Sequence, residues 1–168
     1  MSAYPNKGKQ KKILAIDVPP EQHSSPTNEV RATINNKEFL ASIVGGKYEE
    51  LGEGYLRLSW GIGLLTPEFS LPSIIWIELD SVNHNDDQEY NPAAPESPVT
   101  CWFSDAYNNE GETLIYPAIS GTVKLRHNMD TKIMEGEFSF DVTIPDENNA
   151  FAHYTIKNGH IYIGPTSP

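Results

Sequence analysis

Apolar residues recur at every second position through most of this chain, and this alternation constrains its fold more than any other feature. Successive side chains of an extended strand point to opposite faces, so alternation is typical of a strand with one face in the core. At most one or two helical turns are expected, at residues 47–51 or within residues 86–98. The pattern predicts strands at residues 30–34, 37–43, 55–63, 73–79, 99–105, 112–116, 120–127, 132–144, 151–157 and 160–163, and a short docked strand at 12–18.

The predicted strands are short and are separated by turn-forming residues, as 13 prolines and 12 glycines in 168 residues imply. Closely spaced strands of this kind pair with their neighbours in antiparallel fashion. We predict an all-β fold, an antiparallel two-sheet β-sandwich of roughly nine or ten strands, with a closed or partly open β-barrel as the alternative. Residues 73–79 are apolar enough to be covered on both faces of their sheet.

Asparagine-containing turns are expected to join the first and the last pair of strands. Asn35-Asn36 tolerates positive φ and would place Ala32 opposite Phe39, with the apolar residues on one face. Asn158-Gly159 is a strong two-residue hairpin sequence and predicts a hairpin between residues 151–157 and 160–163.

A third hairpin is predicted around a turn at residues 128–131. In the expected register Leu125 faces Met134 on the buried side, and Lys124 faces Glu135 on the other side. Opposite charges directly across two strands are favourable, so two criteria select the same register.

Charge divides the chain into two regions. Residues 1–28 contain four lysines against Asp17 and Glu21 and sum to +2, so residues 29–168 carry −11 − 2 = −13. We interpret residues 1–28 as a basic tail and a Pro/Ser-rich connection, and residues 29–168 as a single β-sandwich domain. An acidic body repels a phosphate backbone, which argues against nucleic acid as a partner.

Targeting features are absent from the sequence. No stretch approaches the ~20 apolar residues of a membrane span, and no apolar run follows the first lysines as a secretory signal requires. Cys101 is the single cysteine and has no internal disulfide partner. A cytoplasmic location is the default expectation, with export by a signal-free route as the alternative, and the oligomeric state is left open.

Two segments resemble a family of small uncharacterised all-β domains found among bacterial surface lipoproteins of the Bacteroides type. Residues 32–41 (ATINNKEFLA) are similar to the opening hairpin of that family. Within residues 121–159, the stretches GEFSF at 136–140 and IKNG at 156–159 resemble its closing strands. The resemblance covers about a third of the chain and implies the fold, but no activity.

Three groups of residues are candidates for a binding site. Trp76 and Trp102 share a strand face with polar neighbours, so either could present an aromatic plate to a ligand. His153, His160 and Tyr162 fall on the polar face of the predicted last hairpin, where they could form a small-ligand or metal site. The acidic segment after residue 79 offers oxygen ligands for calcium, the one cofactor considered, at Asp80, His84, Asp86 and Asp87.

The sequence contains no nucleophile elbow, zinc-binding His-Glu motif, phosphate loop or dinucleotide fingerprint. We therefore favour a non-catalytic binding module that recognises a protein or carbohydrate through a sheet face or loop. The first alternative is an acidic immunity-type protein that neutralises a basic effector. The second is an enzyme whose carboxylates converge only in space.

Overall fold

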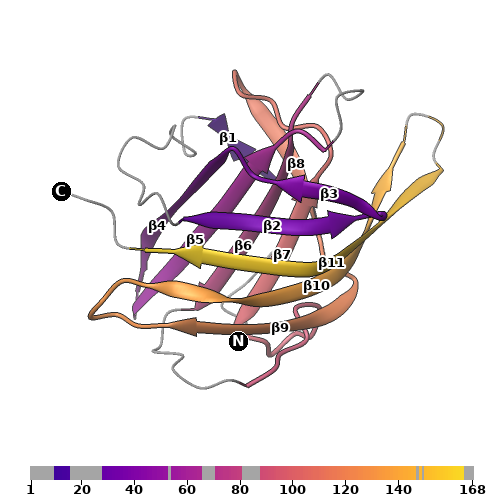
Figure 1. The fold of residues 1–168 in the computed structure, drawn as a ribbon. Helices are drawn as coiled ribbons and strands as arrows, with labels where there is room; N and C mark the ends of the chain where they lie inside the picture. Colours follow the sequence, from indigo (N-terminus) through magenta and orange to yellow (C-terminus); the bar gives the residue numbers. More distant parts are fainter. Residues whose placement is uncertain are drawn as a thin grey trace.

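The computed structural model describes residues 10–15, 28–52, 54–65, 71–80, 88–146, 148 and 150–164. Within these ranges, eleven strands form two antiparallel sheets, as the sequence predicts (Figure 1). The strands are β1 (Lys11–Leu14), β2 (Glu29–Ile34), β3 (Lys37–Leu40), β4 (Ile43–Leu51), β5 (Gly54–Gly63), β6 (Ser73–Asp80), β7 (Val99–Ser104), β8 (Glu112–Pro117), β9 (Ser120–His127), β10 (Met134–Pro145) and β11 (Phe151–Ile163).

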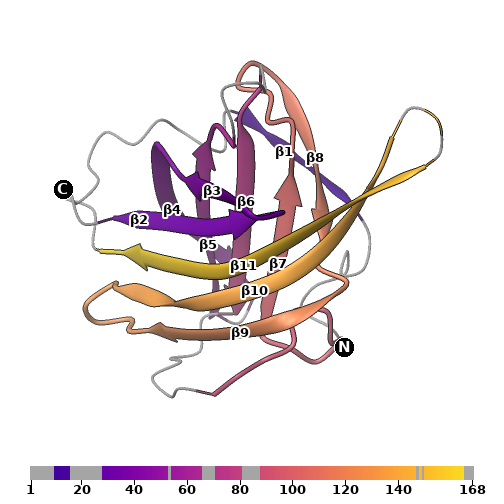
Figure 2. The same ribbon diagram turned by 45° about the vertical axis from the view of Figure 1, so that its right-hand side comes forward.

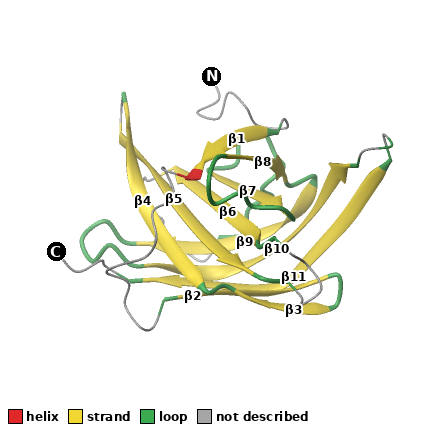
Figure 3. Cartoon of the chain, turned by 90° about the horizontal axis from the view of Figure 1, so that it is seen from above, coloured by secondary structure: helices red, strands yellow, loops and turns green. Residues whose placement is uncertain are grey.

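One sheet has six strands in the order β1-β8-β7-β6-β5-β4, and the other has five in the order β3-β2-β11-β10-β9. The five-stranded sheet crosses one face of the six-stranded sheet, and β1 lies beside β8 at the far end (Figure 2). Seen from above, the six-stranded sheet curls strongly away from the five-stranded sheet (Figure 3). Its two end strands, β1 and β4, are not paired with each other, so the curl stops short of the closed barrel considered as the alternative.

The main core lies between the two sheets. Every second residue of β6 and β7 points into it, and residues of β10 meet them from the other sheet. Gly61 allows the two sheets to approach closely, because a Cβ there would lie 2.6 Å from Val30 Cβ. The side chains at the centre of this core include Ile75, Ile77, Cys101, Phe103, Phe138, Phe140 and Val142.

A second apolar cluster fills the inside of the curled sheet. It forms on the other face of the same strands, which is why β6 and β7 are buried on both faces, as predicted for residues 73–79. Trp60, Trp76 and Trp102 are direct cross-strand partners and form a row across β5, β6 and β7. The rings of Trp60 and Trp76 stack at a centroid distance of 5.3 Å and an interplanar angle of 15°.

Local turn chemistry correctly predicts the first hairpin. Asn35 and Asn36 both have positive φ, and Ala32 pairs with Phe39. The extended strand predicted at residues 37–43 ends instead at Leu40, and the chain then crosses to the other sheet as β4. The expectation of a helical turn at residues 47–51 is therefore wrong, because this segment pairs with β5 along its whole length.

The predicted register of the β9–β10 hairpin is wrong by two residues. Leu125 pairs with Gly136, and Lys124 pairs with Glu137 rather than with Glu135. A shift of two preserves the alternation, so each side chain keeps its predicted face. Glu135 instead meets Arg126, at 3.2 Å between Oε1 and Nη2.

The hairpin predicted at Asn158-Gly159 does not form. β11 runs without a break through both residues, and a bulge at this point places Lys157 and Asn158 opposite Ser139 of β10, whereas Gly159 pairs with Phe138. Asn158 adopts φ 53°, and Gly159 lies against the ring of Phe138. The continuous strand keeps ladders with β10 on one side and β2 on the other, whereas a turn would break both.

Candidate functional site

The structure buries both tryptophans that the sequence offers as exposed aromatic plates. Trp76 is 3% exposed and Trp102 is 1% exposed, so this expectation is wrong for the folded chain. The physical reason is the curl of the six-stranded sheet, which turns their polar-looking strand face inward. Ile13 of β1 and Ile115 of β8 pack in the same cluster.

The two histidines proposed as one site are separated by the continuous β11. His153 pairs with Thr143 near one end of β10, whereas His160 pairs with Glu137 beyond the bulge. Their partners on β10 are six residues apart, which corresponds to roughly 20 Å, so the two imidazoles cannot share a metal ion or a small ligand. Among the described residues, no group of three His, Cys, Asp or Glu side chains is placed to hold a metal ion.

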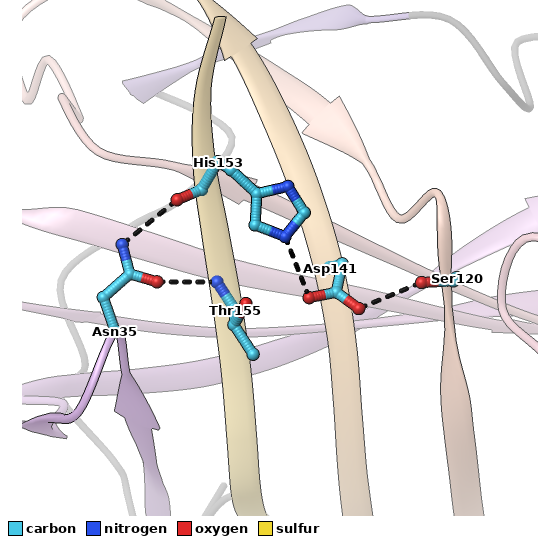
Figure 4. A network of polar contacts seen from close by, with 5 residues as sticks. All are labelled: Asn35, Ser120, Asp141, His153 and Thr155. Carbon is cyan, nitrogen blue, oxygen red and sulfur yellow. Dashed lines mark hydrogen bonds and ion pairs between the residues drawn. The ribbon is translucent and has the colours of Figure 1, made fainter.

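His153 belongs to a polar network on the outer face of the five-stranded sheet (Figure 4). Its Nε2 lies 3.2 Å from Asp141 Oδ1, and Ser120 Oγ donates to Asp141 Oδ2 at 3.0 Å. Asn35 fixes the neighbouring backbone, because its Nδ2 donates to the His153 carbonyl at 3.1 Å and its Oδ1 accepts from Thr155 N at 2.8 Å.

The carboxylate of Asp141 is the centre of this network. Partial burial acts to raise its pKa, but hydrogen bonds from Thr155, Ser120 and His153 together hold the pKa below its usual value. Ser120 donates to the carboxylate rather than to the imidazole. The arrangement therefore differs from a nucleophilic triad, in which the hydroxyl must give its proton to the histidine.

A polar depression of about 420 Å³ lies on the same outer face, at the bulge of β11. Small side chains at Thr122 and Ser139 leave the space open. Gly159 also lines the depression, and the ring of Phe138 fills the position that a Cβ there would take. Its charged lining residues are Arg31 of β2, Glu89, Lys124 of β9, Glu137 of β10 and His160 of β11.

Cross-strand pairing explains how these residues meet. Lys124 and Glu137 are direct partners, Glu137 and His160 are partners across the next ladder, and His160 pairs with Arg31. Glu29 contacts the Arg31 guanidinium and lies 3.6 Å from His160 Nδ1. Four neighbouring strands thus place two cations, one carboxylate and one imidazole in one line across the sheet.

Sequence analysis finds one member of this row, His160, and misses the rest. The alternation already places Lys124 on the outer face, but the two-residue register error pairs it with the wrong glutamate. Tyr162 lies on the same face as His160, half-buried, and pairs with Glu135 outside the depression.

The proposed calcium site falls mostly outside the described residues. Asp80 ends β6, where its backbone N–H donates to the Pro98 carbonyl at 2.8 Å. His84, Asp86 and Asp87 lie outside the described ranges, so calcium binding there stays a prediction.

Across the ranges that the structure describes, no helix is long and apolar enough to cross a membrane. Comparison of the chain with protein-family models, with curated proteins and with solved structures found no match.

Proposed function

We propose that this chain is a non-catalytic binding module that takes a neutral, polyhydroxylated ligand, of the carbohydrate class, in the depression on the outer face of the five-stranded sheet. The observation that carries the proposal is the set of hydrogen-bonding side chains that line the depression, in which Arg31 and Lys124 balance Glu89 and Glu137. The resemblance to the lipoprotein-associated domain family stays part of the proposal and adds no activity to it.

The balance of charge favours a neutral ligand. Arg31 and Lys124 oppose Glu89 and Glu137 within the depression, although the whole chain carries −11. A strongly charged ligand would be repelled either by the two cations or by the two carboxylates of the depression. A ligand with many hydroxyl groups can donate to the carboxylates and accept from the cations, and hydrogen bonds to charged groups are the stronger ones.

The shape of the depression favours a small ligand over a large protein surface. Its volume of about 420 Å³ falls within the range of small-molecule sites, which extends from roughly 300 to 1,000 Å³. Val123 and Phe138 add apolar carbon to an otherwise polar lining.

Binding is favoured over catalysis because Glu89 and Glu137 are both exposed to solvent. Acid–base and electrostatic catalysis gain most from groups held in a site that excludes water. The depression is open and its carboxylates are solvated, so it is suited to binding a ligand but does not exclude water from it.

A glycan array probed with the labelled full-length chain tests the proposal. The matched variants are Glu137→Gln, inside the depression, and Glu135→Gln, two residues away on the same face of β10. We expect wild type and Glu135→Gln to be retained on the same glycans, and Glu137→Gln to lose that retention. Retention of wild type on no glycan, or equal retention of both variants, would reject the proposal.

A further inference from the structure

The inside of the curled sheet contains a site for a primary ammonium group. Lys11 Nζ of β1 lies 4.8 Å from the ring centroid of Trp102 and 5.7 Å from that of Trp76. The same ammonium forms an ion pair with Glu78, which is 4% exposed. Glu78 Oε2 also accepts a hydrogen bond from Trp76 Nε1 at 2.9 Å. Two indole faces and a buried carboxylate are the groups that recognise cations best when water is excluded.

The residues of this site come from β6 and β7 and do not depend on β1 for their positions. Trp76 and Trp102 are cross-strand partners, and Glu78 follows on the same face of β6. Trp60 supports them from β5 by stacking on Trp76. The ammonium site is therefore built by the centre of the sheet, whereas its occupant arrives from the edge.

The wall of the site has unused hydrogen-bonding capacity. Thr100, the cross-strand partner of Glu78, has a buried Oγ1 with no hydrogen-bond partner. The Nε1 of Trp102 is likewise buried and unpaired. Buried polar atoms are normally satisfied, so two unpaired atoms on residues of the site point to a ligand that can still bind there.

The present occupant is held by a short edge strand. β1 makes four register pairs, all with β8, and belongs to the sheet through that one ladder. Burial lowers the pKa of Lys11 to about 8, against the attraction of Glu49 on β4, so seating this lysine carries a desolvation cost. The lysine is therefore supplied by a short edge strand, whereas the site itself is formed by central strands of the sheet.

We propose that the site of Trp76, Trp102 and Glu78 recognises a lysine on an extended segment of a partner protein, which replaces β1 by pairing with β8. β1 then acts as an internal ligand that occupies the site until the partner strand arrives. Charge complementarity supports a basic partner, because residues 29–168 carry −11 − 2 = −13. Strand addition at a sheet edge supplies the backbone bonds, and the lysine supplies selectivity. This site lies on the other sheet from the carbohydrate proposal and is independent of it.

Fluorescence anisotropy at pH 7 with the full-length chain tests the inference. The probe is a labelled peptide with the sequence of residues 10–15, compared with the same peptide carrying norleucine at the position of Lys11. The Lys11→Ala variant vacates the site, and we expect it to bind the lysine peptide about tenfold tighter than the norleucine peptide. Wild type should bind the lysine peptide more weakly, because β1 competes at high effective concentration.

Control variants distinguish recognition of the lysine from nonspecific binding of the peptide. Lys12→Ala removes the neighbouring outward lysine, which pairs with Glu112 at 3.5 Å in solvent, and should behave as wild type. Adding Glu78→Gln to Lys11→Ala should abolish the preference for lysine. If Lys11→Ala does not fold, Lys11→Met, which keeps the aliphatic length, takes its place.

Equal affinity for the two peptides, or no binding of the lysine peptide, would overturn the inference. A Lys11-dependent dimer of wild type in sedimentation experiments would also overturn it, by assigning the site to exchange of β1 between copies.

Discussion

Gly159 lies directly against the phenyl ring of Phe138: a Cβ at position 159 would come within 2.3 Å of two ring carbons. Phe138 is 2% exposed and belongs to the main core, so its ring has little room to retreat. Gly159 also adjoins the bulge of β11 and lines the polar depression, so this contact joins the outer surface to the main core.

Gly159→Ala should destabilise the fold by about 1–3 kcal/mol, the usual cost of forcing an extra methyl into a packed core. Urea denaturation followed by circular dichroism measures the change in free energy of unfolding. Gly52→Ala is the matched control, because a Cβ there meets nothing within 4 Å, and its effect should stay within about 0.5 kcal/mol. Equal effects of the two substitutions would argue against the contact with Phe138.

Asp141→Asn should lower the free energy of unfolding at neutral pH, and this loss should be smaller in acid. The folded-state pKa of Asp141 is lowered, so its stabilisation is present above the unfolded pKa and is lost as pH falls through the folded pKa. Because the network is partly exposed, we expect a loss below about 1 kcal/mol at pH 7. Denaturation of wild type and variant at pH 7 and pH 3 should show the difference shrinking at the lower pH. A difference that grows in acid would contradict the lowered pKa.

Tyr48→Phe should lower the free energy of unfolding, because it removes a contact between the two sheets. Tyr48 Oη of β4 lies 2.6 Å from Nε2 of the buried His127 on β9, which joins the six-stranded sheet to the five-stranded sheet. Loss of one such hydrogen bond typically costs about 0.5–1.5 kcal/mol. A double-mutant cycle with His127→Gln measures the coupling free energy, and a coupling near zero would show that the contact contributes nothing.

Between pH 8 and pH 10, the stability of wild type should rise relative to that of the Lys11→Met variant. Burial lowers the folded pKa to about 8 from the usual 10.5, so over this interval the unfolded chain binds more protons than the folded chain. Stability rises with pH wherever that holds. Denaturation midpoints of both proteins at pH 7, 8, 9 and 10 provide the measurement. A fall in wild-type stability relative to the variant would mean that the ion pair with Glu78 outweighs burial.

Much of the candidate surface is predictable from local alternation. Alternation within each half of β11 places His153 and, separately, His160 and Tyr162 on the outer face, although the predicted hairpin does not form. The two halves differ in parity, so a strict period of two along one strand would put them on opposite faces. The bulge at Asn158 supplies the one extra residue that keeps the two halves of β11 in phase. Alternation could not predict the distance between the two histidines, because it indicates which face a side chain lies on but not where a strand ends.

The sequence by itself determined three features, because each depends on neighbours along the chain. Alternation determined the all-β class and the face on which Phe138, Phe140 and Lys124 lie, and the two asparagines determined the turn at residues 35–36. Only the tertiary structure decided that Trp76 and Trp102 are covered, that Asn158-Gly159 is a bulge, and that β4 is a strand. Each of these outcomes depends on what packs against the segment: the curl of a whole sheet, the ring of Phe138 and the free edge of β5. Such partners are distant in sequence, and their combined free energy overrides local preference.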